Sequence, residues 1–237
     1  MAPSPLTFKI FERFPNVTYG FSRRVDGSMH RHLEKSNRDT YFRKIHIDPA
    51  RVVTADQVHG IKVARVFDET AGKMIDGTDG LMTDTKKLYL TATAADCFLL
   101  YFYDPTKNAV SIAHAGWRGV LGGIAVNVVG EMMTSFGTKP EDLLVGVSPG
   151  IQQCHFEISP KDRKSFARYS DFVSTKDGRV FVDLPSILKI QLVRAMVRTE
   201  HIDMSDECTH CNEAEYFSFR RDKPKDVEPM VGYIGLC

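Results

Sequence analysis

Short runs of apolar residues, spaced for strands, alternate along the chain with longer runs spaced for helices. Four segments rich in Leu, Val, Tyr, Phe or Thr predict buried strands. These are residues 88–93, 98–103, 109–113 and 143–147. Residues 52–66 predict two shorter strands around a turn at His59-Gly60, and the Gly- and Asp-rich residues 76–84 predict a loop that enters another short strand. Residues 6–21 predict an extended entry into the fold.

Three segments have the three-to-four-residue apolar spacing of amphipathic helices. Residues 34–45 are one, ended by Asp48-Pro49. Residues 122–136 are the second, with Gly137 placed as a C-cap, and residues 184–200 are the third. Strands and helices alternate without a regular βαβ repeat. We therefore predict a single α/β (α+β) domain with mixed β-sheets over residues 1–237.

Composition narrows the class of protein. The 237 residues are 43% hydrophobic and 26% charged with a net charge of +1, which gives no electrostatic case for a nucleic-acid or anionic-membrane partner. No apolar run approaches the ~20 residues of a membrane span, and residues 1–11 do not resemble a signal peptide. The five scattered cysteines favour free thiols in a reducing compartment. We expect a soluble, cytoplasmic protein, either a monomer or a small homo-oligomer.

Three short motifs stand where predicted strands end. They are DQVHG at residues 56–60, AADC at 94–97 and HAGWRG at 114–119. Strand ends that feed loops are where α/β proteins place their sites. Taken singly, Cys97 is more typical of a small buried apolar residue, and His59 or His114 of a hydrogen-bonded structural residue. Their coincidence at three strand ends is what favours a shared site.

Two imidazoles and one thiolate form a ligand set that suits zinc and leaves the fourth position open for water or substrate. We therefore predict that His59, Cys97 and His114 converge around one zinc ion. Asp96 could orient a ligating imidazole or act as an acid or base, and a solvated turn carboxylate is an equal alternative. Arg118 could help to hold an anion at a helix N-terminus. The alternative for Arg118 is an ion pair on the surface.

Two further features carry weaker expectations. Cys208-Thr209-His210-Cys211 resembles half of a zinc knuckle, but no second pair follows it, so a structural role is expected. Trp117 and the run 217–219 could supply an apolar wall for a flat ligand, although both are more often core.

The three motifs, in this order and spacing, resemble those of the YfiH-type laccase-domain family, also labelled multicopper polyphenol oxidase or purine nucleoside phosphorylase. The resemblance extends over nearly the whole chain. It includes GFSRR at residues 20–24, Asn37-Arg38, DGLMT at 79–83, SPGI at 148–151, FEI at 156–158, Cys208-Thr209 and FSFRRD at 217–222. Residues 27–37 are shorter than the family's usual segment, and the tail after Asp222 lacks its Gly-Arg-Met sequence.

This resemblance implies a layered α/β/β/α fold and a zinc site formed by His59, Cys97 and His114, with Arg38 near the substrate. It implies phosphorolysis of purine nucleosides such as adenosine and inosine, with methylthioadenosine phosphorolysis and adenosine deamination as companion activities. We expect Arg38, and with less support Arg24, to hold phosphate or substrate. For Arg38 the alternative is an ion pair on a helix surface.

Other functions are weighed against this one. A copper oxidase of the laccase type needs many more imidazoles than the eight histidines and single His-x-His, at residues 30–32, that the chain contains. A metal-free hydrolase with Cys97 as nucleophile and His114 as base, acting on amide or peptidoglycan-fragment substrates, is the main alternative. A binding protein without catalysis does not account for three convergent reactive residues.

Overall fold

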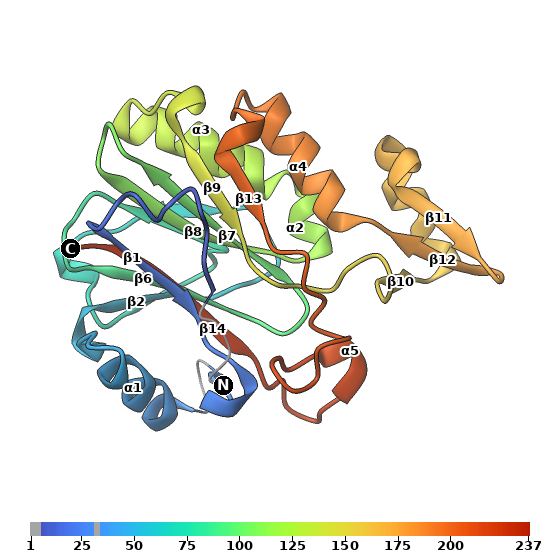
Figure 1. The fold of residues 1–237 in the computed structure, drawn as a ribbon, viewed down its shortest axis with the longest axis horizontal. Helices are drawn as coiled ribbons and strands as arrows, with labels where there is room; N and C mark the ends of the chain where they lie inside the picture. The colour runs from blue at the N-terminus through green and yellow to red at the C-terminus, as the bar shows by residue number, and fades with distance from the viewer. Residues whose placement is uncertain (1–5, 31–33) are drawn as a thin grey trace.

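The computed structural model describes residues 6–30 and 34–237, and within them the strands form three sheets (Figure 1). One sheet is five-stranded, and its C-terminal strand β14 lies between β1 and β6, antiparallel to both. In spatial order its strands are β1 (Val17–Phe21), β14 (Met230–Leu236), β6 (Tyr89–Ala94), β2 (Val52–Ala55) and β4 (Met74–Ile75).

The second sheet is six-stranded and mixed. In spatial order its strands are β13 (Ile202–Met204), β9 (Leu144–Val147), β7 (Phe98–Asp104), β8 (Ala109–Ala115), β5 (Gly80–Thr83) and β3 (Val63–Arg65). The predicted pair of strands within residues 52–66 is confirmed as β2 and β3, but the two belong to different sheets. The chain therefore crosses between the sheets there.

The helices cover the outer faces of the two stacked sheets (Figure 1). Helix α1 (Lys35–Lys44) packs on the five-stranded sheet, while α2 (Trp117–Gly122), α3 (Ile124–Phe136) and α4 (Leu184–Arg194) cover the six-stranded sheet. The apolar core accordingly falls into three clusters, one between the sheets and one under each helical layer. The expected α/β/β/α layering is confirmed.

Strand β7 shows why its sequence is a continuous apolar run. All seven of its residues are buried. Leu99 and Tyr101 pack into the core between the sheets, while Phe98 and Phe102 pack under the helices. A strand covered on both faces cannot alternate apolar with polar residues.

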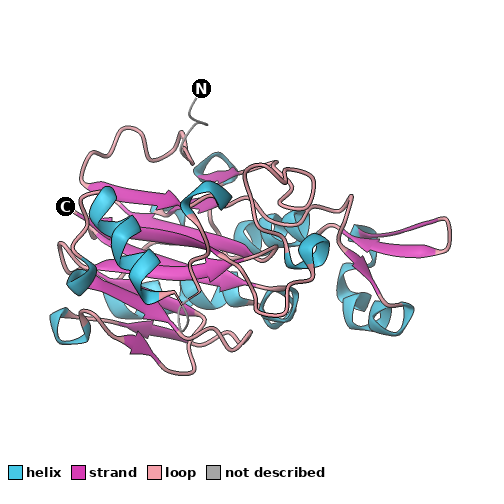
Figure 2. Cartoon of the chain, turned by 90° about the horizontal axis from the view of Figure 1, so that it is seen from below, coloured by secondary structure: helices cyan, strands magenta, loops and turns pink. Residues whose placement is uncertain are grey.

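A small unit projects from one end of the layered body (Figure 2). It contains the third sheet and a 3-10 helical segment, Pro160–Phe172, whose side chains are mostly exposed. Its strands are β10 (Glu157–Ile158), β12 (Arg179–Val182) and β11 (Val173–Lys176). Neither this unit nor β14 and β13 was predicted. Strands β10 to β13 have only two to four residues each, too few to carry a periodic signal, whereas the seven-residue, fully buried β14 is apolar and was overlooked.

The third predicted helix is shorter than expected. It ends at Arg194 because Met196 adopts a left-handed backbone, with φ of 69°. The Val197 N–H then bonds back to the Leu192 carbonyl at 3.1 Å and closes the helix end. The second predicted helix is confirmed as α3 with Gly137 at its C-cap, and α2, which was not predicted, precedes it and ends at the left-handed Gly123. A last short helix, α5, spans Phe219–Asp222. Among the described helices none combines the length and the apolar character that crossing a bilayer requires.

Candidate active site and metal centre

The structure brings His59, Cys97 and His114 together, as predicted. Their ligand atoms all lie within 4.8 Å of one another. The His59 and His114 rings meet edge to face, with centroids 4.8 Å apart. His59 is exposed, Cys97 is half-buried and His114 is buried, so the cluster opens toward solvent on the His59 side.

The fold explains this convergence. His59 lies in the loop that carries the chain from β2 in one sheet to β3 in the other, and Cys97 lies in the turn from β6 to β7, a second crossing between the sheets. His114 belongs to β8, where it pairs with Leu99 of β7, only two residues beyond Cys97. The site therefore sits at the junction of the two sheets.

Asp79 organises the site and was missed as a site residue by the sequence analysis. Its side chain is fully buried and accepts backbone N–H groups from Val58 at 3.2 Å, His59 at 3.0 Å and Gly60 at 2.6 Å. Its Oδ1 also lies 2.9 Å from Nδ1 of His114. One carboxylate thus fixes the loop that carries His59 and the ring of His114.

The Asp79 contact determines which nitrogen of His114 faces the cluster. An ionised carboxylate only accepts hydrogen bonds, so Nδ1 of His114 donates, and Nε2 is the nitrogen that can bind a metal once it loses its proton. Burial raises the pKa of Asp79, but the bonds from His114, Gly60 and His59 outweigh it, and the pKa of this carboxyl falls below its ordinary value. Asp79 is therefore ionised at neutral pH.

Cys97 and His114 form a charged pair. Burial raises the pKa of the Cys97 thiol, but the imidazoles of His114 and His59 lower it to about 6. Burial lowers the pKa of His114, while the Cys97 thiolate and Asp79 raise it to about 9. Without a metal, the pair is thus a thiolate and an imidazolium at neutral pH. A thiolate is the form that binds metals or attacks electrophiles.

Three residues of this region hold left-handed backbones that non-glycine residues rarely adopt. They are Gln57, His59 and Asp96, with φ of 64°, 61° and 87°. Such conformations cost on the order of 1–3 kcal/mol each and persist where neighbouring contacts fix them. The buried side chain of Gln57 supplies some of these contacts, since it accepts from the Thr93 N–H at 2.8 Å and donates to the Thr93 carbonyl at 2.6 Å.

Gly116 forms one wall of the cluster. A Cβ at this position would lie 3.1 Å from Sγ of Cys97, 3.1 Å from Cδ2 of His59 and 3.5 Å from Cε1 of His114. Only a residue without a side chain leaves this contact surface against all three. The two nitrogens and one sulfur that converge there fit a tetrahedral metal site with one open position.

Among the described contacts the Asp96 carboxylate meets neither imidazole of the cluster, and Asp79 is the carboxylate bonded to the His114 ring. The Asp96 carboxylate accepts the Thr209 hydroxyl at 2.7 Å and the Arg220 backbone N–H at 2.7 Å. It is buried, so the alternative of a solvated turn carboxylate does not hold either. Asp96 ties the turn before Cys97 to a distant segment of the chain.

The structure places the three candidate arginines in different surroundings. Arg118 is exposed, and its guanidinium lies 4.4 Å from the centroid of the Trp117 ring. Arg24 lies over the Phe217 ring at 5.2 Å and 3.5 Å from an Asp222 carboxylate oxygen. Neither shows a direct bond to the His59–Cys97–His114 cluster among the described contacts.

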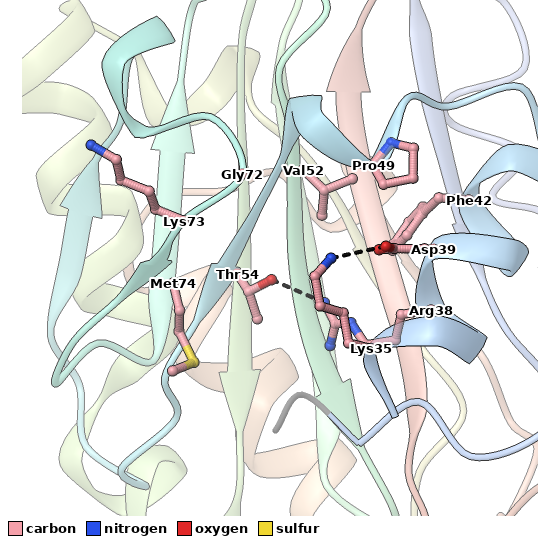
Figure 3. A pocket seen from close by; sticks show the side chains of 10 residues that line it. All are labelled: Lys35, Arg38, Asp39, Phe42, Pro49, Val52, Thr54, Gly72, Lys73 and Met74. Carbon is pink, nitrogen blue, oxygen red and sulfur yellow. Dashed lines mark hydrogen bonds and ion pairs between the residues drawn. The ribbon is translucent and has the colours of Figure 1, made fainter. Parts of the chain in front are cut away.

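Arg38 is buried under α1 rather than spread on the helix surface. Its guanidinium donates to the hydroxyls of Thr54 on β2, at 2.9 Å, and Thr91 on β6, at 3.4 Å. It lines a pocket of about 150 Å³ that Lys35 and Lys73 also line (Figure 3). The helix-surface ion pair is instead the one between Lys35 and Asp39, at 2.8 Å. The expected role of Arg38 in holding phosphate remains a prediction.

Comparison with known proteins places this site in a family. Residues 26–237 match the family described as multi-copper polyphenol oxidoreductase laccase. The chain belongs to this family. It is 34% identical over 198 residues to the purine nucleoside phosphorylase YlmD of Geobacillus stearothermophilus, which covers 78% of this chain and 72% of that relative.

Other members of the laccase-domain family extend the likeness. An adenosine deaminase, RL5, from an unknown prokaryotic organism is 29% identical over 198 residues, which cover 78% of this chain and 75% of that protein. The crystal structure of the Bacillus licheniformis hypothetical protein YfiH matches with a TM-score of 0.89 at 29% identity, over 100% of this chain and 97% of that one. The fold is therefore that of the family throughout.

The family's description names a multicopper enzyme, but the described residues of this chain contain no histidine cluster of the kind that binds several copper ions. Within residues 6–30 and 34–237, two groups bring three or more metal-ligating side chains together, and neither contains more than two histidines. His32, of the single His-x-His motif, lies outside the described residues. A multicopper oxidase needs a cluster with many more imidazoles.

Proposed function

We propose that this protein is a purine nucleoside phosphorylase that converts adenosine or inosine and inorganic phosphate to the free base and ribose 1-phosphate. The observation that carries the proposal is the His59–Cys97–His114 cluster, held by Asp79 at the junction of the sheets. It occurs in a chain related over most of its length to proteins named purine nucleoside phosphorylases.

The metal that this cluster would hold is zinc. Two imidazoles and a thiolate within 4.8 Å of one another form a set that zinc binds with one position left open. Copper of the blue type would accept similar ligands but also needs a weak axial ligand, commonly a methionine. When bound to these three residues, zinc would supply a Lewis acid to a substrate or water.

The reaction itself needs an anion site. A phosphate oxygen forms a bond to the anomeric carbon of the ribose as the bond to the base nitrogen breaks, and the bonding pair leaves with the purine. Arg118 is a candidate for holding the phosphate, because it follows Gly116 by two residues and its guanidinium is exposed, with the Trp117 ring as its contact. Arg38, with Lys35 and Lys73 around the same pocket, is the second candidate.

The purine needs an apolar surface. Of the aromatic residues predicted for this role, Phe217 is buried in the core and Trp117 packs on Phe166, with ring centroids 5.9 Å apart. Phe219 is 51% exposed and precedes Arg220, whose backbone N–H bonds to Asp96 beside Cys97. We therefore assign the wall for the base to Phe219, and expect Phe219→Ala to raise the KM for nucleoside without changing the KM for phosphate.

The decisive experiment incubates the zinc-loaded protein with adenosine, inosine and methylthioadenosine, with and without phosphate, and identifies the products. Phosphorolysis requires base and ribose 1-phosphate in equal amounts, at a rate that rises with phosphate concentration. Cys97→Ala should abolish turnover. Base released equally fast without phosphate would show a hydrolase instead.

Arg118→Ala and Arg38→Ala separate the two phosphate candidates. The variant that removes the true ligand should raise the KM for phosphate by about tenfold or more, corresponding to the ~1.5–3 kcal/mol of a charged hydrogen bond. Arg38→Ala should also lower the melting temperature, because it leaves Thr54 and Thr91 without their shared donor. Unchanged phosphate dependence in Arg38→Ala would reduce its role to positioning α1.

A second activity, deamination of adenosine, is favoured by the relative named adenosine deaminase. It would appear in the same assay as inosine formed from adenosine without phosphate. If no purine nucleoside is turned over, the Cys97 and His114 pair supports a hydrolase of amide or peptidoglycan-fragment substrates, active without metal. We also propose a cytoplasmic location, since none of the five cysteines forms a disulfide, and a monomer or small homo-oligomer.

A further inference from the structure

A second cluster of metal-ligating side chains lies apart from the residues of the proposed active site. It joins Cys154 and His155, in the loop between β9 and β10, to Cys208 and Cys211, in the loop after β13. Cys154 and Cys211 are 57 positions apart in sequence. Three sulfurs and one ring nitrogen all lie within 4.8 Å of one another. The pair that completes the Cys208–Cys211 knuckle thus precedes it in the chain.

The distances match the edges of a tetrahedron around one ion. Zinc–sulfur bonds of about 2.3 Å and zinc–nitrogen bonds of about 2.0–2.1 Å place two sulfurs about 3.8 Å apart and sulfur and nitrogen about 3.5 Å apart. The Cys154 and Cys211 sulfurs are 3.8 Å apart. Nδ1 of His155 lies 3.2 Å from Cys154, 3.3 Å from Cys211 and 4.0 Å from Cys208 sulfur.

The surroundings hold these side chains in place. The Gln152 backbone N–H donates to Sγ of Cys208 at 3.5 Å, and the backbone N–H groups of His210 and Cys211 also approach this sulfur. Such N–H donors offset the charge of metal-bound thiolates. The ring of His155 stacks on His210, with centroids 3.8 Å apart and planes 13° apart, which fixes its orientation.

We propose that Cys154, His155, Cys208 and Cys211 bind one zinc ion as a closed structural site. Four protein ligands leave no open position, so this ion would serve the fold and not the chemistry. A disulfide between Cys154 and Cys211 is the competing use of these thiols. It would require the separation of the two sulfurs to fall from 3.8 Å to about 2.05 Å. It would also not account for the position of Cys208 and His155 beside them.

The site is linked to the catalytic cluster by a short path of hydrogen bonds. Thr209, between the two knuckle cysteines, donates its hydroxyl to Asp96, which precedes Cys97. The Arg220 backbone bonds to the same carboxylate, and its guanidinium donates to the carbonyls of Glu157 at 2.7 Å and His155 at 3.4 Å. The second zinc would therefore hold the segment that positions the turn before Cys97.

Metal counting on full-length protein tests the proposal. Protein purified with reductant and zinc, then exchanged into metal-free buffer, should contain about two zinc ions per chain by mass spectrometry of the metal. The Cys211→Ser variant should contain one zinc ion, at the His59–Cys97–His114 cluster. The Cys97→Ala variant should also contain one, at the second cluster. Cys237→Ser, which removes an exposed cysteine outside both clusters, should retain two. Equal zinc content in wild type and Cys211→Ser would overturn the proposal.

A second measurement uses wild-type protein, so it does not depend on whether the variant folds. Iodoacetamide should modify Cys237 readily but leave Cys154 and Cys211 unmodified, although both are exposed, until a chelator is added. Protection that survives the chelator and ends only with a reductant would indicate a disulfide and overturn the proposal. X-ray absorption of Cys97→Ala protein should show three sulfurs and one nitrogen around zinc.

Discussion

At the scale of single residues, Asp79 positions two of the three candidate metal ligands, although it is not a ligand itself. It accepts three backbone N–H groups from the His59 loop and one from the His114 ring. A carboxylate has enough lone pairs for four donors, whereas an amide of the same shape has only one oxygen and adds two donors of its own. The position therefore demands Asp rather than Asn.

We predict that Asp79→Asn weakens zinc binding at the His59–Cys97–His114 cluster by about 10–100-fold, the usual effect of losing a partner that orients a metal-bound histidine. Competition with a chromophoric chelator measures the affinity. Asp84→Asn is the matched control, because Asp84 lies just past the other end of β5, where it pairs with Arg65 on the surface. Equal affinities in the two variants would contradict the role given to Asp79.

The charge pair at Cys97 predicts a pH dependence in protein stripped of metal. Because the pKa of Cys97 is lowered to about 6, its thiolate persists down to that pH and is lost only as the pH falls through it. Alkylation of Cys97, followed by peptide mapping, should therefore reach half its maximal rate near pH 6. His114→Ala removes the strongest lowering influence and should move the midpoint upward. A wild-type midpoint near the ordinary 9.0 would contradict the assignment.

At the scale of elements, the turn from β8 into α2 is shaped by Gly116. Adding a methyl group there displaces Cys97 and His59 by a few tenths of an ångström, because contacts of 3.1 Å to both are tighter than nearly all contacts that a Cβ makes, while the 3.5 Å contact to His114 is ordinary. We predict that Gly116→Ala loses most of its zinc at this cluster while the fold persists. Zinc content and the far-ultraviolet circular dichroism spectrum together check this.

Gly130→Ala provides the comparison. Gly130 lies inside α3, and a Cβ there would meet no atom within 4 Å. Alanine should raise stability by about 0.5–1 kcal/mol, because it restricts the unfolded chain and favours the helix. It should leave zinc content unchanged. Zinc loss in both variants would show that the effect of Gly116→Ala is a general one.

The elements also explain which site residues can be predicted from the sequence and which cannot. His59, Cys97 and His114 could be predicted because each stands in a short motif at the end of a strand with strong apolar periodicity. Asp79 could not be given its role, because nothing local tells which histidine its carboxylate meets. The Cys154-His155 half of the second cluster was missed for a similar reason, since its partners lie beyond α4 and only the folded chain brings them together.

At the scale of the whole molecule, the candidate site depends on the spacing between the two sheets, because His59 and Cys97 lie on segments that connect them and His114 lies on one of them. Gly232 of β14 is one of the residues that sets this spacing. A Cβ at Gly232 would overlap Leu99 and the hydroxyl of Tyr101, which donates to the Gly20 carbonyl at 3.0 Å. These side chains lie in the core between the sheets.

We predict that Gly232→Ala lowers the free energy of unfolding by about 1–3 kcal/mol, the usual effect of overfilling a packed core. It should also weaken zinc binding at the His59–Cys97–His114 cluster, although Gly232 is not a ligand, because the sheets must shift to admit the methyl group. Urea unfolding and the chelator competition measure the two effects. Lower stability with unchanged zinc affinity would show that the cluster tolerates a change in spacing.

The position of β14 has a consequence for how the protein is made. This strand follows every other described strand in sequence, yet it is hydrogen-bonded between β1 and β6, second from one edge of the five-stranded sheet. On the ribosome, β1 and β6 emerge long before the strand that joins them, and their edges stay open to wrong partners until residues 230–236 arrive. The nascent chain would therefore need protection by chaperones during translation, and ribosomes that stop before residue 230 would release material for degradation rather than a partly active enzyme.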